Sequence, residues 1–223
     1  MGLLVTVPYL AAGSWVSPQA PPLQHVLDAQ IPFVPESVWV YLPGYWACFV
    51  IPVLVIREAR SFRAALTGLS MLTVLALPFF LYFPVPAPRP SVPMDPSLTS
   101  ALVRWLYSTD PASNTFPSLH VANATFCAMV TTAADRRWGA VVWVLAAGVC
   151  VSVLTLKQHW VVDIPAGWGL AAVGIATWRA QLDAPSVLAR LLARFAGWLP
   201  ARVPTSELPR LQSVRSTRRR PRA

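Results

Sequence analysis

Four long apolar runs constrain the fold of this 223-residue chain more than any other feature of its sequence. Each is bounded by charged residues or proline, and they cover residues 37–56, 62–82, 138–156 and 161–182. About 20 residues of helix cross the ~30 Å hydrocarbon core of a bilayer, where a helix satisfies its own backbone polar groups. The runs therefore predict an all-α polytopic membrane bundle.

Two further segments set the expected number of transmembrane helices at five or six. Residues 119–134 form an apolar run that is shorter than the other four, and we interpret it as a helix whose first turn emerges from the bilayer. Residues 1–16 lack the positive start of a signal peptide, so a tilted sixth span, a re-entrant piece and an interfacial segment all stay open. We expect the membrane-embedded domain to cover residues 1–183.

Composition and charge narrow the class of protein further. A hydrophobic content of 55% with only 12% charged residues excludes a disordered chain and argues against a soluble domain. The net charge of +9 is concentrated at the C-terminal end, where we expect an amphipathic cytoplasmic helix at 184–205 and a basic, disordered tail at 206–223. No aromatic residues interleave with the arginines of this tail, so we expect no nucleic-acid partner.

The arginines between the runs predict the orientation in the membrane. They cluster in the connections 57–63 and 136–137, and alternation of the spans places both connections and the C-terminus on one face. Positively charged loops are retained in the cytoplasm, so this face is predicted to be cytoplasmic. The opposite face receives the loop 83–117 and the connection 157–160. A composition rich in alanine, valine and arginine favours a bacterial cell membrane.

Two of the three histidines lie at the extracytoplasmic ends of predicted spans, where ionisable residues favour a functional role. His159 and Asp163 are four residues apart, so on a helix the carboxylate would orient the imidazole and free its other nitrogen as a nucleophile. An aspartate at a helix start beside a loop histidine explains the pair equally well. Pro165 leaves the position of the helix start open.

Two other segments have the residue types of a phosphate site. Pro117 suits a first helical turn that Ser118 or a neighbouring polar residue can cap, which creates an anion site at which His120 can supply a proton. Arg89, in a proline-rich stretch just outside a span, could clamp phosphate oxygens, although an interfacial arginine is the simpler interpretation of that residue alone.

These three segments, in this order and each beside an apolar run, resemble the motifs of the type-2 phosphatidic acid phosphatase and vanadium haloperoxidase superfamily, in its membrane branch. The family pattern is Lys-x6-Arg-Pro, Pro-Ser-Gly-His and Ser-Arg-x5-His-x3-Asp. Its counterparts here are Arg89-Pro90, then Pro117-Ser118-Leu119-His120, then Ser152, His159 and Asp163. Tyr82 and Val153 stand where the family has a lysine and an arginine. Leu119 and the run Lys157-Gln158-His159 are more similar to inositol phosphorylceramide synthases and related lipid phosphotransferases.

The resemblance implies a metal-independent lipid phosphatase without a cofactor, acting on a lipid phosphate or pyrophosphate in the bilayer. His159 would attack phosphorus, Asp163 would orient it and His120 would protonate the leaving oxygen. The phosphoryl oxygens would be bound by Arg89, Ser118 and Lys157, the last in place of a missing cation. The alternatives are a lipid phosphotransferase, which passes the phosphoryl group to an alcohol, and a non-enzymatic protein that binds lipid headgroups. The lipid, the acceptor and the oligomeric state stay open.

Overall fold

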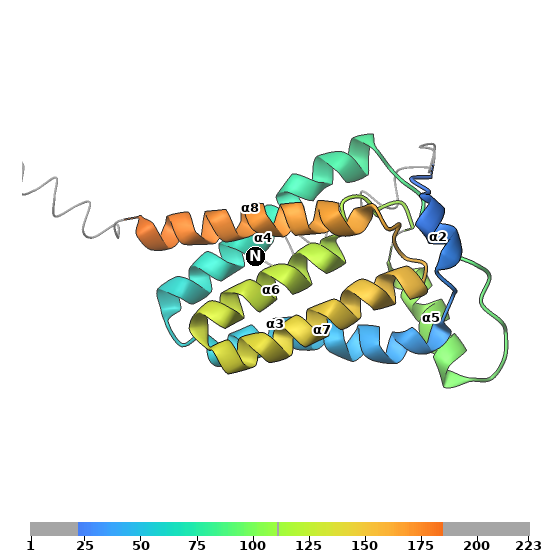
Figure 1. Cartoon of the computed structure of the whole chain (residues 1–223), viewed down its shortest axis with the longest axis horizontal. Coiled ribbons are helices and arrows are strands. Elements are labelled where there is room, and N and C mark those ends of the chain that lie inside the picture. Colours follow the sequence, from blue (N-terminus) through green and yellow to red (C-terminus); the bar gives the residue numbers. More distant parts are fainter. Residues whose placement is uncertain (1–21, 111, 185–223) are drawn as a thin grey trace, which may run out of the picture. The chain divides into compact units, whose positions relative to one another are not determined.

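The computed structural model describes residues 22–110 and 112–184, and within them the regular elements are helical (Figure 1). The predicted run 1–16 and the segments 185–205 and 206–223 lie outside these residues. The elements are α2 (Val26–Gln30), the 3-10 turn η1 (Pro35–Ser37), α3 (Val38–Val55), α4 (Ala59–Tyr82), α5 (Leu98–Thr109), α6 (Leu119–Ala134), α7 (Arg136–Thr155) and α8 (Asp163–Asp183).

The predicted runs correspond to α3, α4, α6, α7 and α8, which confirms an all-α membrane bundle. Three of them are both long and apolar enough to cross a bilayer: Pro35–Val55, Ala59–Tyr82 and Arg136–Thr155. The α8 helix has 21 residues, but its glycines and the polar residues near its two ends lower its mean hydropathy. Pro165 falls in the first turn of α8, where proline leaves no helical hydrogen bond unmade.

The short helix α6 lies at the centre of the bundle and packs against α3, α4, α7 and α8. Figure 1 shows it between α7 and α8. Eleven of its 16 residues are buried, including His120 near its first end. A helix enclosed by protein does not need to match the thickness of the bilayer, which explains how a 16-residue helix belongs to the bundle. Its burial also places the histidine inside the protein rather than against lipid.

The outward faces of the surrounding helices are apolar. Large hydrophobic side chains are more than half exposed on α3 and α7, among them Trp46, Leu54, Val144 and Val151. In water such a surface would be costly, whereas hydrocarbon is its natural solvent. The buried polar side chains Ser118, His159 and Asp163 lie by contrast inside the bundle, at the end where α6 and α8 begin. We call this end the histidine end.

Gly167 brings α8 very close to the start of α6. A Cβ atom at this position would lie 2.8 Å from the carbonyl oxygen of Ser118 and 3.0 Å from Cβ of Val121. Small residues allow membrane helices to approach in this way, and close packing is a main source of their association. Gly167 lies four residues from Asp163. Its close contact with α6 therefore fixes the distance between the starts of α6 and α8 at the histidine end.

The segment 83–117, expected to be a loop, contains an additional helix, α5, that was not predicted from the sequence. Ser97 caps α5 by accepting a hydrogen bond from the Ser100 N–H at 3.2 Å. Val103 and Leu106 on one face of α5 join the hydrophobic core. The segments that flank α5 are held together by a parallel bridge between Val85 and Asn114. The loop is thus a packed structure across the histidine end.

Candidate active site

The His159 imidazole is held by the first residue of α8. Its Nδ1 lies 3.1 Å from Oδ2 of Asp163, and the same oxygen accepts a hydrogen bond of 2.9 Å from the Trp160 N–H. The predicted pairing is therefore present, although His159 lies in the turn before α8 rather than on the helix. Both side chains are nearly inaccessible, with 2% and 0% exposed. Asp163 thus fixes the orientation of the ring.

The second histidine faces the first. Nδ1 of His120 lies 3.0 Å from Nε2 of His159, and both rings are buried. A carboxylate at Nδ1 of His159 keeps the proton on that nitrogen, so Nε2 is the acceptor and Nδ1 of His120 is the donor. The contact thus presents the unprotonated, nucleophilic nitrogen of one ring to the N–H of the other. This is the pairing that a nucleophile and a general acid require.

Ser118 is the N-cap of α6, as the sequence allowed. Its Oγ accepts a hydrogen bond from the Val121 N–H at 3.3 Å, and the residue is fully buried. The hydroxyl hydrogen can still be donated elsewhere. The first N–H groups of α6, at Leu119 and His120, lack intrahelical acceptors because of their position in the helix. Together with the helix dipole they make this end attractive to an anion.

Two tyrosines of α3 also contact His120. The ring centroids of Tyr41 and Tyr45 lie 5.5 Å and 4.9 Å from the imidazole, and the two phenol rings stack on each other at 5.8 Å. Asn123, one turn along α6 from His120, donates a hydrogen bond of 3.2 Å to the hydroxyl of Tyr45. The rings limit the orientations that the imidazole can adopt. Neither tyrosine was predicted as a site residue, although their i,i+4 spacing puts them on one face of an apolar helix.

The guanidinium of Arg89 binds the end of α5. Its Nη1 donates to the carbonyl oxygens of Tyr107 and Asp110 at 3.0 Å and 2.9 Å, and Nη2 lies 3.2 Å from Oδ2 of Asp110. It also lies 4.8 Å from the centre of the Tyr107 ring. Burial raises the pKa of this phenol to about 12, and the Arg89 charge partly offsets the effect. Phosphate binding by Arg89 stays a prediction, because its terminal nitrogens have protein partners.

Lys157 is similarly engaged. Its Nζ donates to the carbonyl oxygens of Asp28 and Ile31 at 3.1 Å and 2.5 Å, which ties the loop before His159 to the end of α2. The carboxylate of Asp28 reinforces this link by accepting from the Val161 N–H at 2.8 Å. An ammonium group has three donors, so one stays available to a phosphoryl oxygen. That role also stays a prediction.

A cavity of about 190 Å³ reaches His159 and Lys157 at the histidine end. It is lined by His159 and Lys157 together with Gln24, Asp28, Ile31, Pro88, Leu154 and Trp160. Its volume is below that of sites for whole drug-sized ligands, and it suits a small polar group such as a phosphoryl headgroup. Neither His120 nor Ser118 lines it, so a ligand entering from this side meets His159 first. Among the described residues, no group of three or more His, Cys, Asp or Glu is placed to hold a metal ion.

Comparison with known families bears directly on this cluster. A family model described as the PAP2 superfamily matches residues 14–177, which include every candidate site residue described above. The chain belongs to the PAP2 superfamily. No protein of curated function and no solved structure matches it. Membership supports an activity of the phosphatase or phosphotransferase type in a membrane-embedded protein.

The two departures from the superfamily motifs have different surroundings. Tyr82, where the PAP2 motif has lysine, is 82% exposed at the end of α4. Val153, in place of arginine, is fully buried in the core, and Ser152 donates its hydroxyl hydrogen to the Gly148 carbonyl at 2.7 Å. Neither position therefore offers a polar group to the histidines. Among the described residues of the candidate site, Arg89 and Lys157 carry positive charge.

Asp110 and Gln158 are site residues that the motifs did not reveal. Nε2 of Gln158 lies 3.5 Å from Oδ2 of Asp110, the oxygen that also faces Arg89. Gln158 is almost completely buried, and its Oε1 has no hydrogen-bond partner among the described residues. Its position next to His159 was a signal that could have identified it. Asp110 gave no such signal, because its neighbours in the sequence belong to no motif.

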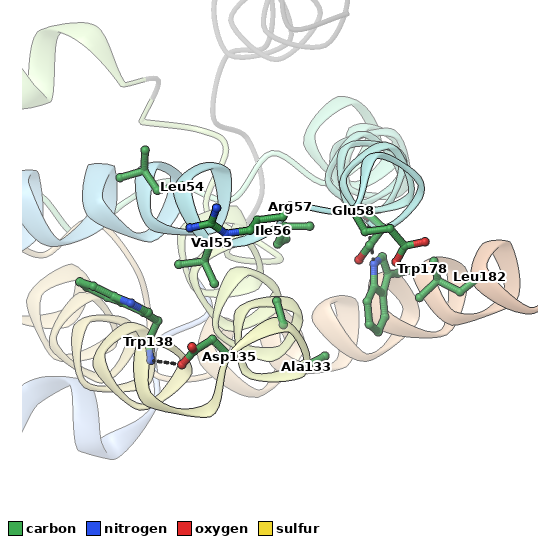
Figure 2. A pocket seen from close by; sticks show the side chains of 12 residues that line it. Leu54, Val55, Ile56, Arg57, Glu58, Ala133, Asp135, Trp138, Trp178 and Leu182 are labelled. Carbon is green, nitrogen blue, oxygen red and sulfur yellow. Dashed lines mark hydrogen bonds between the residues drawn. The ribbon is translucent and has the colours of Figure 1, made fainter. Parts of the chain in front are cut away.

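A larger cavity, of about 510 Å³, lies at the opposite end of the helices (Figure 2). The ends of α3, α6 and α8 and the starts of α4 and α7 form it, and Arg57, Glu58, Asp135, Trp138 and Trp178 are among the side chains around it. It contains no histidine, and the Asp135 carboxylate caps α7 by accepting from the Trp138 N–H at 3.1 Å. Of these two cavities, the smaller one at the histidine end is the one lined by predicted site residues, His159 and Lys157.

Proposed function

We propose that the protein is a metal-independent lipid phosphatase, which hydrolyses a lipid phosphate or pyrophosphate through a phosphohistidine intermediate. The observation that carries this proposal is the continuous series of contacts from Asp163 to His159 to His120. It combines an oriented nucleophile with a proton donor directly opposite its free nitrogen. Superfamily membership supports phosphoryl chemistry in general, and the series of contacts supports this mechanism.

In the first step, the lone pair on Nε2 of His159 forms a bond to phosphorus. The bond from phosphorus to the lipid oxygen breaks, and His120, acting as an imidazolium, passes its Nδ1 proton to that oxygen, so the lipid leaves as a neutral alcohol and His120 becomes a neutral imidazole. Asp163 accepts the Nδ1–H hydrogen bond of His159 throughout and stabilises the positive charge that develops on the ring. The two nitrogens are 3.0 Å apart without substrate, so the phosphoryl group must separate the rings as it enters.

In the second step, water replaces the lipid alcohol. His120, now unprotonated, takes a proton from the water as its oxygen attacks phosphorus, and the bond to His159 breaks to release phosphate. Ser118, the first N–H groups of α6, and the cations Arg89 and Lys157 would hold the phosphoryl oxygens during both steps. An alcohol in place of water would convert the same cycle into a transferase.

The mechanism is tested by turnover and by trapping. The full-length protein in detergent, without divalent metal, is given a panel of lipid phosphates, and the released phosphate and lipid products are identified. We expect His159→Ala to abolish turnover and Asp163→Asn to reduce it by about 10²–10⁴. Wild-type protein quenched in alkali should carry a phosphoryl group on His159. His25→Ala, which changes the exposed third histidine, is the matched control and should keep full activity.

Unchanged turnover in His159→Ala would refute the proposal. The products separate the two enzymatic alternatives, because free phosphate indicates a phosphatase and a lipid with an exchanged headgroup indicates a phosphotransferase. Lack of turnover across the panel, with retained binding of lipid phosphates, would instead favour the headgroup-binding protein.

We also propose that the histidine end faces the extracytoplasmic side of a bacterial cell membrane and that the C-terminus is cytoplasmic. The arginines at the opposite end of the helices support this orientation. Met94 is 88% exposed in the loop before α5, and Glu58 is exposed in the turn before α4. A membrane-impermeant thiol reagent should label Met94→Cys in intact cells and Glu58→Cys only after permeabilisation. The reverse result would contradict the orientation.

A further inference from the structure

The Asp110 carboxylate holds Arg89 in the way that a bound phosphoryl group would. Its Oδ2 is the anionic partner of Nη2 at 3.2 Å, and the two side chains are only 11% and 15% exposed. The Asp110 backbone carbonyl adds a second contact at 2.9 Å. Carboxylates and phosphates bind the same edge of a guanidinium group, so they compete for it. Of this guanidinium only the buried Nε has no partner among the described residues.

Asp110 also adjoins the segment that carries the nucleophile. Its Oδ2 lies 3.5 Å from Nε2 of Gln158, the residue immediately before His159. The carboxylate therefore lies between Arg89 and the loop that presents the reacting imidazole. A phosphoryl group that reaches both Arg89 and His159 must come close to this negative charge. Lys157, the other cation of the candidate site, makes its hydrogen bonds to the backbone carbonyls of Asp28 and Ile31.

We propose that Asp110 is an internal competitor for Arg89, which weakens the binding of dianionic phosphates more than that of monoanionic ones. The repulsion between a fixed carboxylate and a ligand scales with the ligand's charge, and low exposure reduces its screening by solvent. This inference rests on the proposed function, in which the released product is dianionic phosphate. Product phosphate is not anchored in the bilayer by an acyl chain, so the carboxylate returns to Arg89 and assists its release.

Binding of two small phosphates tests this role without requiring turnover. Inorganic phosphate at pH 8 is mainly a dianion, whereas dimethyl phosphate is a monoanion of similar shape. Each is titrated calorimetrically into the full-length protein in detergent. We expect Asp110→Asn to increase the affinity for inorganic phosphate at least tenfold and that for dimethyl phosphate by a clearly smaller factor. Adding Arg89→Gln to this variant should remove the gain.

Two further variants control for charge and folding. Asp95→Asn removes a carboxylate from the same loop at a fully exposed position, and it should leave both affinities unchanged. Asp110→Ser repeats the loss of charge with a different side chain, and thermal unfolding confirms that each variant is folded. An Asp110 with a merely structural role would change both affinities by the same factor or reduce both, and either result overturns the inference.

The outcomes also separate this inference from the proposed function. Phosphate binding that is insensitive to Asp110, in a protein that loses its turnover in His159→Ala, overturns the inference alone. Charge-dependent binding that responds to Asp110, in a protein without any phosphatase turnover, supports the inference and overturns the phosphatase. Failure of both phosphates to bind to any variant overturns the phosphate site itself.

Discussion

Replacing Gly167 by alanine should disturb the active site through helix packing alone. The added methyl group would lie 2.8 Å from the Ser118 carbonyl oxygen and 3.0 Å from Cβ of Val121, whereas ordinary contacts begin at 3.4 Å. The nearest atom belongs to the backbone, so a side-chain rotation cannot relieve the clash. The α6 and α8 helices must therefore separate by about half an ångström.

Gly169, two residues further along α8, provides a matched control. A Cβ atom there meets nothing within 4 Å. Both substitutions gain the same helix propensity, about 1 kcal/mol or less, so this contribution cancels when the two variants are compared. The difference in their stabilities is the cost of overpacking, about 1–3 kcal/mol. We expect Gly169→Ala to unfold at or above the wild-type temperature and Gly167→Ala to unfold below Gly169→Ala.

Activity should separate the two variants even more clearly than stability. The separation occurs beside Ser118 at the start of α6 and close to Asp163 at the start of α8. Because Asp163 orients His159, moving the two helices apart disturbs the contact of His159 with His120. Displacements of about 1 Å can cost 10²-fold in rate, so half that distance should cost about tenfold. Lipid-phosphate turnover and thermal unfolding in detergent measure both effects. A Gly167→Ala protein that matched Gly169→Ala in both would refute the packing argument.

Substitutions at three further positions test the segments around the site. Lys157 has a φ of 52°, a backbone conformation that glycine adopts without strain. Lys157→Gly should therefore be more stable to thermal unfolding than Lys157→Ala by about 1 kcal/mol. Equal losses of activity in the two variants would support phosphate binding by the lysine. Asp28→Asn should lower stability by about 1.5–3 kcal/mol and reduce turnover, because the Val161 N–H loses its charged acceptor; an unchanged unfolding temperature would contradict this. Burial raises the pKa of Tyr107 in the folded protein above its pKa in the unfolded chain. The folded state is therefore stabilised by the neutral phenol below pH 10, and this stabilisation is lost as the pH rises toward 12. Tyr107→Phe cannot ionise and should lose less stability over that range in thermal unfolding, although at neutral pH it forfeits the 2.6 Å hydrogen bond to the Leu156 carbonyl.

The membrane helices could be predicted because the bilayer imposes one length and one composition on them. The run predicted at 138–156 differs by only a residue or two at each end from α7, Arg136–Thr155. The α5 helix escaped prediction because it is short and amphipathic and gains its stability from tertiary packing rather than from lipid. Its capping serine, Ser97, was a visible signal that the proline-rich surroundings obscured.

The contacts of the candidate site were also only partly predictable from the sequence. The spacing of His159 and Asp163 predicted their contact, since four residues separate them and local geometry decides the distance. The contact of His120 with His159 joins residues 39 apart, so only the family resemblance could pair them. The partner of Arg89 was not predictable, because Asp110 reaches it through the packing of a loop that contains α5.

The hydrogen bonds from α2 to the loop before α8 have a consequence for biogenesis. Asp28 near the start of the chain binds Val161, and His120 midway along it meets His159 just before the last described helix. Helices enter the membrane in the order in which they are synthesised. A nascent chain with α3, α4, α6 and α7 inserted and α8 still at the ribosome would therefore lack both the oriented nucleophile and the hydrogen bond that holds its loop. Turnover should accordingly begin only when α8 is inserted, which protects membrane lipids from partly assembled protein and makes activity a reporter of completed insertion.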